Sequence, residues 1–243
     1  MNIIKRNFGS FKDKEVIEYT IDNGEGLEVK ILNLGCIIRE LNFHGKNRVL
    51  GYASLDEYLN RKGNLGTLVG RVAGRISGGQ INIDGQVYEL DKNEGSTCLH
   101  GGSDGFARQV WDLVEEEVGI DHISIKFKYL SQDLEAGFPG QLTVYTKYTI
   151  NKVNEIKVEY FGQTDKPTIV TLTNHSYFNL NDHLYDNILD HQLYVNADQY
   201  ISLDEKSIPR AIKEVEDSPF DFRQERTIDE TMDLSHEDLE ITR

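Results

Sequence analysis

Alternation of apolar and polar side chains with a period of two residues most constrains the fold of this 243-residue chain. Residues 27–32 read Leu-Glu-Val-Lys-Ile-Leu, and residues 123–129 alternate Ile, Phe and Tyr with Ser and Lys. This period is typical of a strand with one buried face. No long amphipathic segment with helical periodicity accompanies it, so the sequence predicts an all-β fold.

A hairpin and a meander are the clearest local predictions. Residues 81–88 alternate about an Asp-Gly pair, which tolerates the positive φ angles of a type I′ turn. The runs 123–129, 141–150 and 156–160 are rich in β-branched and aromatic residues and are separated by turn-forming residues. These three runs predict consecutive antiparallel strands.

Other local patterns add further strands and one helical turn. Residues 36–43 predict a strand paired with 27–32, and residues 192–195 predict another strand. Ser54 and Glu57 have the spacing of a capping box, which predicts a short helix. The sequence contains no fixed-period repeat, low-complexity tract or clear linker, so one domain over residues 1–243 is expected.

The composition limits which classes of partner molecule and which cell compartment are expected for the protein. The net charge is −15, and a strongly acidic surface repels nucleic acids and anionic membranes. The N-terminus lacks the apolar core of a signal peptide, and no run of about 18 apolar residues is found. Cys36 and Cys98 are too few for a disulfide scaffold and are expected to be packing thiols. These features predict a soluble, cytoplasmic protein.

His175 is the first candidate for chemistry. It follows the apolar run 169–172 and lies between Asn174 and Ser176, where a buried strand is expected to reach the surface. A histidine with a pKa near about 6.5 can act as a general acid or base. On these residues alone, a structural histidine at a strand end is the favoured interpretation.

Other candidates are His100, beside Gly101 and Gly102, and two arginines in a glycine-rich stretch, Arg71 and Arg75. The histidine spacings favour no metal site, and neither a phosphate-binding loop nor a nucleophilic serine elbow is found. The 41 acidic residues offer many possible carboxylate pairs, so hydrolysis by such a pair stays an alternative. Two histidines and an arginine suit a polyhydroxylated ligand, provided that the fold brings them together.

The sequence resembles the aldose 1-epimerase (galactose mutarotase) family. Three segments carry the resemblance: residues 70–76 are similar to the family's GRVANRI, residues 99–102 to LHGG, and residues 173–180 to TNHxYFNL. Between them, Gly105-Phe106, Val110-Trp111-Asp112 and Phe138-Pro139-Gly140 fall in the expected order, and the likeness runs from about Tyr19 to Phe222.

The resemblance implies a large antiparallel β-sandwich, the galactose mutarotase-like supersandwich. It also implies an isomerase that interconverts the α and β anomers of hexoses such as galactose and glucose, with no cofactor and no metal. His175 would be the general acid at the ring oxygen, and His100 would steady the open-chain form. The substrate-binding residues would be Arg75, Gly74, His100, Tyr177 and Arg71.

Two departures from the family pattern qualify these expectations. Gly74 stands where many members have asparagine. Members also continue well beyond the position of Arg243 and carry there an aspartate and the catalytic glutamate, so we expect a C-terminally truncated sandwich with little activity of its own. A short homologue that binds sugar without turnover is the alternative explanation. A hexose-6-phosphate 1-epimerase is a further alternative, disfavoured because no extra basic cluster accompanies Arg71 and Arg75. The oligomeric state is not predicted.

Overall fold

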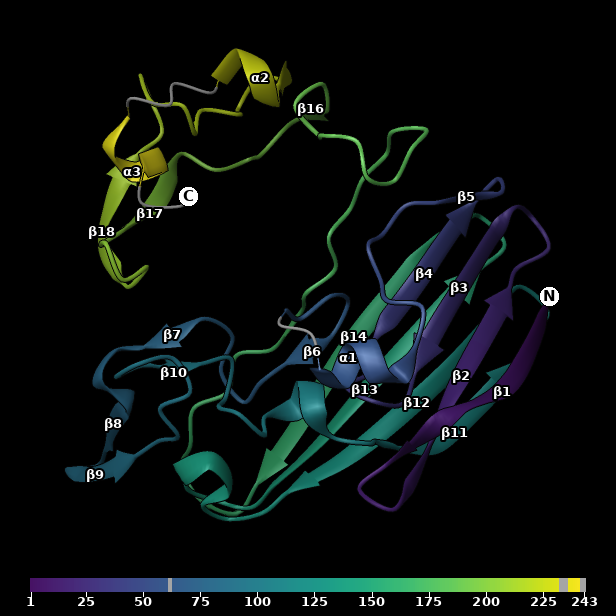
Figure 1. The fold of residues 1–243 in the computed structure, drawn as a ribbon, viewed down its shortest axis with the longest axis horizontal. Coiled ribbons are helices and arrows are strands. Elements are labelled where there is room, and N and C mark those ends of the chain that lie inside the picture. Colours follow the sequence, from purple (N-terminus) through teal and green to yellow (C-terminus); the bar gives the residue numbers. More distant parts are fainter. Residues whose placement is uncertain (61–62, 232–235, 241–243) are drawn as a thin grey trace. The chain divides into compact units, whose positions relative to one another are not determined.

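The computed structural model describes residues 1–60, 63–231 and 236–240 (Figure 1). The chain divides into two compact units, Met1–Phe178 and Asn179–Arg243, which are described separately. Strands outnumber helices in both units and make up most of the regular structure of the described residues, which confirms the all-β prediction. The single-domain expectation over residues 1–243 stays a prediction.

The first sheet is an antiparallel meander built from the N-terminal residues. Strand β4(Ile38–Phe43) starts two residues later than predicted, because Gly35 and Cys36 both adopt positive φ in the turn after β3(Leu27–Leu32). The pairing of β3 with β4 confirms the predicted neighbouring strands. The order in the sheet is β1(Asn2–Phe11), β2(Lys14–Asp22), β3(Leu27–Leu32), β4(Ile38–Phe43), β5(Lys46–Asn47).

The second sheet confirms the predicted meander. Along β13(Leu142–Asn151) every second residue is buried, as the period of two requires. Four strands pair antiparallel in sequence order: β11(Asp112–Val118), β12(His122–Ser131), β13(Leu142–Asn151), β14(Ile156–Thr164).

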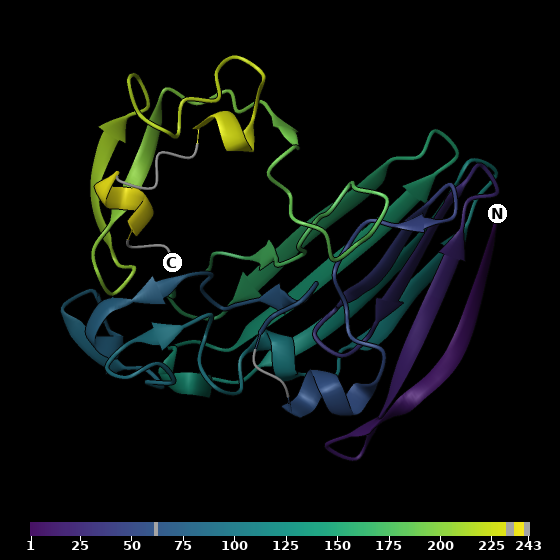
Figure 2. The ribbon, with the colours of Figure 1, turned by 45° about the horizontal axis from the view of Figure 1, so that its top comes forward.

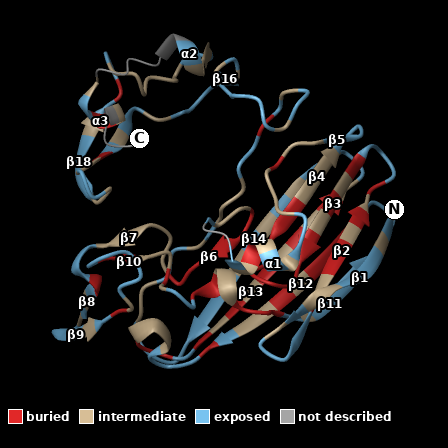
Figure 3. Ribbon diagram, viewed as in Figure 1, coloured by how far each residue is buried: buried red, intermediate tan, exposed pale blue. Residues whose placement is uncertain are grey.

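The two sheets face each other across one hydrophobic core, as Figures 2 and 3 show. Tyr19 of β2 meets Phe127 of β12 edge to face, with ring centroids 5.3 Å apart. The buried hydroxyl of Tyr148 on β13 donates to the backbone oxygen of Cys36 at 2.6 Å. This hydrogen bond ties the second sheet to the turn that precedes β4. The two facing sheets and their shared core make the first unit a β-sandwich.

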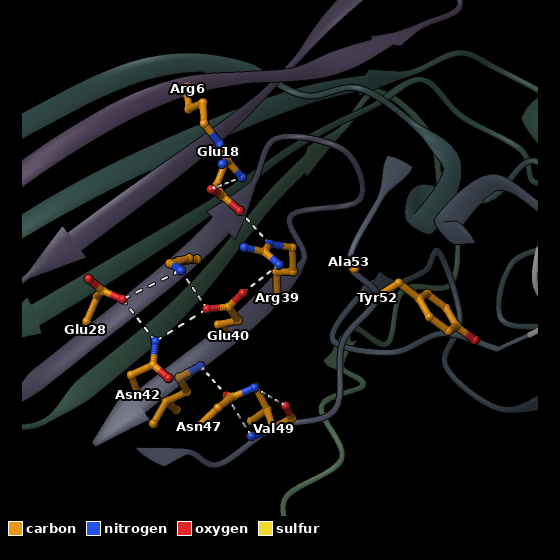
Figure 4. Close-up of polar contacts among 12 residues, drawn as sticks. Arg6, Glu18, Glu28, Arg39, Glu40, Asn42, Asn47, Val49, Tyr52 and Ala53 are labelled. Atoms are coloured by element: carbon orange, nitrogen blue, oxygen red, sulfur yellow. Dashed lines mark hydrogen bonds and ion pairs between the residues drawn. The ribbon is translucent and has the colours of Figure 1, made fainter. Parts of the chain in front are cut away.

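An ionic network around the buried pair of Glu18 and Arg39 crosses the first sheet (Figure 4). The Glu18 carboxylate accepts from Nε of Arg39 at 2.5 Å and pairs with Arg6 at 3.0 Å, while Arg39 also pairs with Glu40 at 2.6 Å. Buried charges require such partners. The network therefore links β4 to β1 and β2 across β3.

Short elements extend the first unit beyond its two sheets. The predicted cap at Ser54 is confirmed, because Ser54 Oγ accepts from the amide of Glu57, and the Glu57 carboxylate reaches back to accept from the amide of Ala53. The predicted hairpin is confirmed with positive φ at Asp84 and Gly85. These elements are α1(Leu55–Asn60), β6(Leu68–Val69), β7(Arg75–Ile76), β8(Gln80–Ile83), β9(Gln86–Glu89), β10(Cys98–Leu99), β15(Thr173–Asn174) and three 3-10 turns, η1(Ser77–Gly79), η2(Phe106–Arg108), η3(Glu135–Gly137).

The second unit contains two strand pairs, β16 with β19 and β17 with β18. The strand predicted at 192–195 is present but spans only two residues, because the amide of Val195 leaves the ladder and donates to Phe222. The elements are β16(Gln192–Leu193), β17(Gln199–Leu203), β18(Pro209–Glu214), β19(Arg226–Thr227), α2(Ile228–Thr231), α3(Glu237–Glu240).

Both cysteines are buried and free, as predicted for packing thiols. Among the described helices, none has the length and apolar character needed to cross a bilayer.

We expect Tyr148→Phe to lower the free energy of unfolding by about 1–3 kcal/mol, because the Cys36 carbonyl is then left buried without its donor. Chemical denaturation measures this change. The control is Tyr145→Phe, a half-buried tyrosine on the same strand that faces away from the core cluster. Equal stability of the two variants would contradict the role of the buried hydroxyl.

Candidate active site

Two short antiparallel pairings bring the candidate histidines together. Strand β15 pairs with β6, which places Thr173 opposite Val69, and β10 pairs with β7, which places Leu99 opposite Arg75. Both β6 and β7 belong to the glycine-rich segment 68–76. His175 and His100 follow β15 and β10 directly, and their ring centroids lie 5.2 Å apart at 86°.

The LHGG loop closes tightly on this segment. A Cβ atom on Gly101 would lie 1.9 Å from the backbone oxygen of Gly70, and Gly101 has a φ of +86°. Glycine therefore satisfies both the space and the backbone angle at this position. The loop holds His100, itself at a φ of +53°, against the segment that carries Arg75.

A hydrogen bond fixes the tautomer of His100, and burial fixes its charge. Its Nδ1 accepts from the amide of Gly74 at 3.0 Å, so the neutral ring carries its proton on Nε2. Burial lowers the pKa of His100 to about 4, and the nearby positive charges of His175 and Arg75 act in the same direction. Near neutral pH, His100 is therefore an uncharged Nε2–H donor.

His175 is fixed through its backbone. Its amide donates to the Thr67 oxygen at 2.8 Å, and its oxygen accepts from the amide of Gly66 at 3.0 Å. The half-buried ring lies between His100 and Tyr177, whose ring centroid is 5.0 Å away. Within the described part of the chain, no hydrogen bond engages the ring nitrogens of His175. They are available to a ligand.

Arg75 is held by a carboxylate that sequence reasoning missed. Its Nε donates to Glu94 at 2.5 Å, and a second guanidinium nitrogen donates to the other carboxylate oxygen at 2.9 Å. This bidentate hydrogen bonding raises the pKa of Arg75 and lowers that of Glu94. Glu94 lies in the polar loop before LHGG, and nothing in its spacing distinguishes it from the other acidic residues.

Gly74 contributes its backbone to the site. It has a φ of +85°, and a Cβ there would meet no atom within 4 Å. Its amide orients His100, and its oxygen accepts from the His100 amide at 2.9 Å. The open space beside Gly74 is where a larger residue would project.

Arg71 requires a correction to the predicted set of substrate-binding residues. Its side chain is 2% exposed and donates to the hydroxyl of Ser131. Its guanidinium also donates to the backbone oxygens of Gln132, Pro139 and Gly140. These acceptors lie in the turn between β12 and β13. Burial and these bonds leave Arg71 a structural role, and only Arg75 lies beside the histidines.

Among the described residues, no group of three or more His, Cys, Asp or Glu side chains is arranged to hold a metal ion. The groups near the histidine pair include the charged side chains of Arg75 and Glu94 and the ring of Tyr177. The arrangement can donate hydrogen bonds and exchange a proton with an oxygen-rich ligand.

Comparison with known proteins gives matches over most of the chain. The model of the family "Aldose 1-epimerase" matches residues 18–240. Galactose mutarotase from Sus scrofa is 39% identical over 204 residues, which cover 82% of this chain and 58% of that protein. Aldose 1-epimerase from Haemophilus influenzae is 36% identical over 211 residues, with coverage of 84% and 60%. The chain thus spans less than two thirds of the length of these curated relatives.

Solved structures resemble the fold over nearly the whole chain. Galactose 1-epimerase from Lactobacillus acidophilus has a TM-score of 0.91 and 28% identity, and the match covers 99% of this chain and 71% of that one. An aldose epimerase homologue from C. elegans has a TM-score of 0.82 and 31% identity, with coverage of 90% and 67%.

We expect Arg71→Met to lower the free energy of unfolding by about 2–5 kcal/mol, because several buried carbonyls lose their donor. Chemical denaturation tests this, with Arg210→Met on exposed strand β18 as the matched control. A loss no larger than that of the control would contradict the structural role.

We also expect an NMR titration to place the pKa of His100 near 4, because burial disfavours the imidazolium. His122, whose pKa is raised by a hydrogen bond with Asp121, serves as the internal comparison and should titrate above its ordinary value. A His100 midpoint at or above that of His122 would contradict the assigned environment.

Proposed function

The chain belongs to the aldose 1-epimerase family, and from this premise we propose that it serves the interconversion of the α and β anomers of hexoses such as galactose and glucose. The observation that carries the proposal is the 5.2 Å approach of His100 and His175, two rings with different hydrogen bonding. One ring is a neutral donor fixed by Gly74, and the other has ring nitrogens available to a ligand.

In the proposed reaction, protonated His175 donates its proton to the ring oxygen of the sugar. The bond between C1 and the ring oxygen breaks, and a base takes the proton of the anomeric hydroxyl, so that an open-chain aldehyde forms. Rotation about the bond between C1 and C2 followed by the reverse steps gives the other anomer. No described residue is proposed for the base.

The other residues are proposed to bind and orient the sugar. His100 donates from Nε2 to a sugar oxygen, which steadies the open-chain form. Arg75, oriented by Glu94, donates to hydroxyl groups, while the half-exposed ring of Tyr177 borders the sugar. Gly74 acts through its backbone, because its amide fixes the tautomer of His100.

An unphosphorylated sugar suits this site better than a phosphorylated one. The guanidinium of Arg75 is already neutralised by Glu94, and the net charge of the chain is −15. A phosphate group would require further unpaired cations beside the histidines. The proposal therefore names a neutral hexose as partner and needs no cofactor.

We also propose a cytoplasmic location. Two buried cysteines without a disulfide agree with a reducing compartment.

Polarimetry of freshly dissolved α-galactose tests the proposal. We expect His175→Ala to remove whatever acceleration the unmodified chain gives, down to the spontaneous rate, because the proton donor is lost. His183→Ala, a change of an exposed histidine in the other unit, should leave the rate unchanged. A catalysed rate that is the same in His175→Ala as in the unmodified protein would contradict the assignment.

Calorimetry with galactose separates the alternative of a non-catalytic sugar-binding module. If the unmodified protein binds galactose but does not accelerate its mutarotation, the result favours the binding module over the enzyme.

A further inference from the structure

The loop that carries Glu94 is braced against strand β10. The side chain of Asn93 pairs with Leu99 in both directions, since its nitrogen donates to the Leu99 oxygen at 3.0 Å and its oxygen accepts from the Leu99 amide at 2.8 Å. Glu94 and Thr97 exchange two backbone hydrogen bonds, at 3.1 and 2.9 Å. These contacts hold the position of Glu94 beside Arg75 through groups other than its own carboxylate.

The ion pair occupies one edge of the Arg75 guanidinium. The Glu94 carboxylate engages Nε and Nη2, and among the described residues no group accepts a hydrogen bond from Nη1. Most of the five N–H groups of an arginine therefore remain for a ligand. Glu94 thus leaves Arg75 its capacity to donate hydrogen bonds and cancels its charge.

The charge of Glu94 is also felt at the histidines. Burial, the largest effect, lowers the pKa of His100, and Glu94 opposes this effect by raising that pKa. The side chains of Arg75 and Glu94 are 28% and 42% exposed, so water screens them only in part. A ligand that covers the pair displaces this water, which strengthens both the attraction of the guanidinium and the repulsion of the carboxylate.

A neutral sugar and an anionic sugar therefore meet different forces at this pair. A hydroxyl group accepts from the remaining N–H groups of Arg75 whether or not the charge of the guanidinium is cancelled. A carboxylate or phosphate group gains little, because Glu94 repels it while Arg75 attracts it. Repulsion of the wrong ligand is a general means of achieving specificity.

We propose that Glu94 is a specificity-determining residue that excludes anionic sugars, such as uronates and sugar phosphates, from the site. The inference rests on the proposed function, because it assigns the choice among hexoses at His100 and His175 to one carboxylate. Glu94 acts through Arg75 and takes no part in proton transfer, so its effect is on which sugar binds.

Titration calorimetry with galactose and galacturonate tests the proposal, because these sugars differ only in the hydroxymethyl or carboxylate group at C6. The unmodified protein should bind galacturonate at least about tenfold more weakly than galactose. Glu94→Gln keeps an oxygen acceptor for Arg75 but removes the charge. It should tighten galacturonate binding about tenfold, while galactose binding changes less than about threefold. Added salt should reduce the gain for galacturonate and leave galactose binding unchanged.

Three further variants separate the charge of Glu94 from a role in structure. Glu94→Asp keeps the charge and should keep galacturonate excluded. Glu89→Gln is the matched control, because it removes an exposed carboxylate that pairs with Lys92, and it should change neither affinity. Arg75→Met, added to Glu94→Gln, should abolish the gain for galacturonate, because the anion then loses its cation.

Several results would overturn the proposed selection. One is galacturonate binding as tight as galactose binding in the unmodified protein. Others are no gain for galacturonate in Glu94→Gln, an equal loss of both affinities in that variant, or the same gain in Glu89→Gln. If galactose still binds in these cases and His175→Ala weakens that binding, the proposed function stands and the selection alone fails. If the unmodified protein binds neither sugar, both fail.

Discussion

The site depends on the backbone pairing of one short segment, residues 68–76, with two segments distant in sequence. Through β6 this segment holds β15 and His175, and through β7 it holds β10 and His100. Each pairing spans only two residues on each strand, so tertiary contacts must support it. The buried guanidinium of Arg71 supplies one such support, because it fastens the middle of the segment to the turn between β12 and β13. The sandwich thereby fixes the distance between the two histidines.

Chemically, the two histidines differ because their surroundings differ. Gly74 donates to His100 and burial keeps that ring neutral, while His175 is held by its backbone and leaves its ring nitrogens to a ligand. A neutral ring that donates a hydrogen bond and a second ring with nitrogens available to a ligand are suited to divide binding and proton transfer between them. Glu94 is a third functional side chain of the site, because its carboxylate fixes the guanidinium of Arg75.

Much of the fold could be predicted from the sequence, because the period-two pattern reports which strand faces are buried. The hairpin at residues 81–88, the meander after residue 123 and the capping box at Ser54 all rest on local rules and are confirmed. Arg71 and Arg75 could not be told apart in this way, since both are arginines in one glycine-rich stretch and only burial separates them. Glu94 was missed for a similar reason, because its pairing with Arg75 arises from the tertiary path of the loop before LHGG. The division into two compact units was also not indicated by composition.

The central claim is that His100 and His175 contact one sugar at the same time. A galactose titration followed through the ¹⁵N signals of the imidazole rings tests it most directly. The account predicts that the signals of His100 and His175 shift with one common dissociation constant, while those of His122 and the exposed His183 stay unchanged. A sugar-dependent shift at only one ring of the pair, or two different dissociation constants, would contradict it.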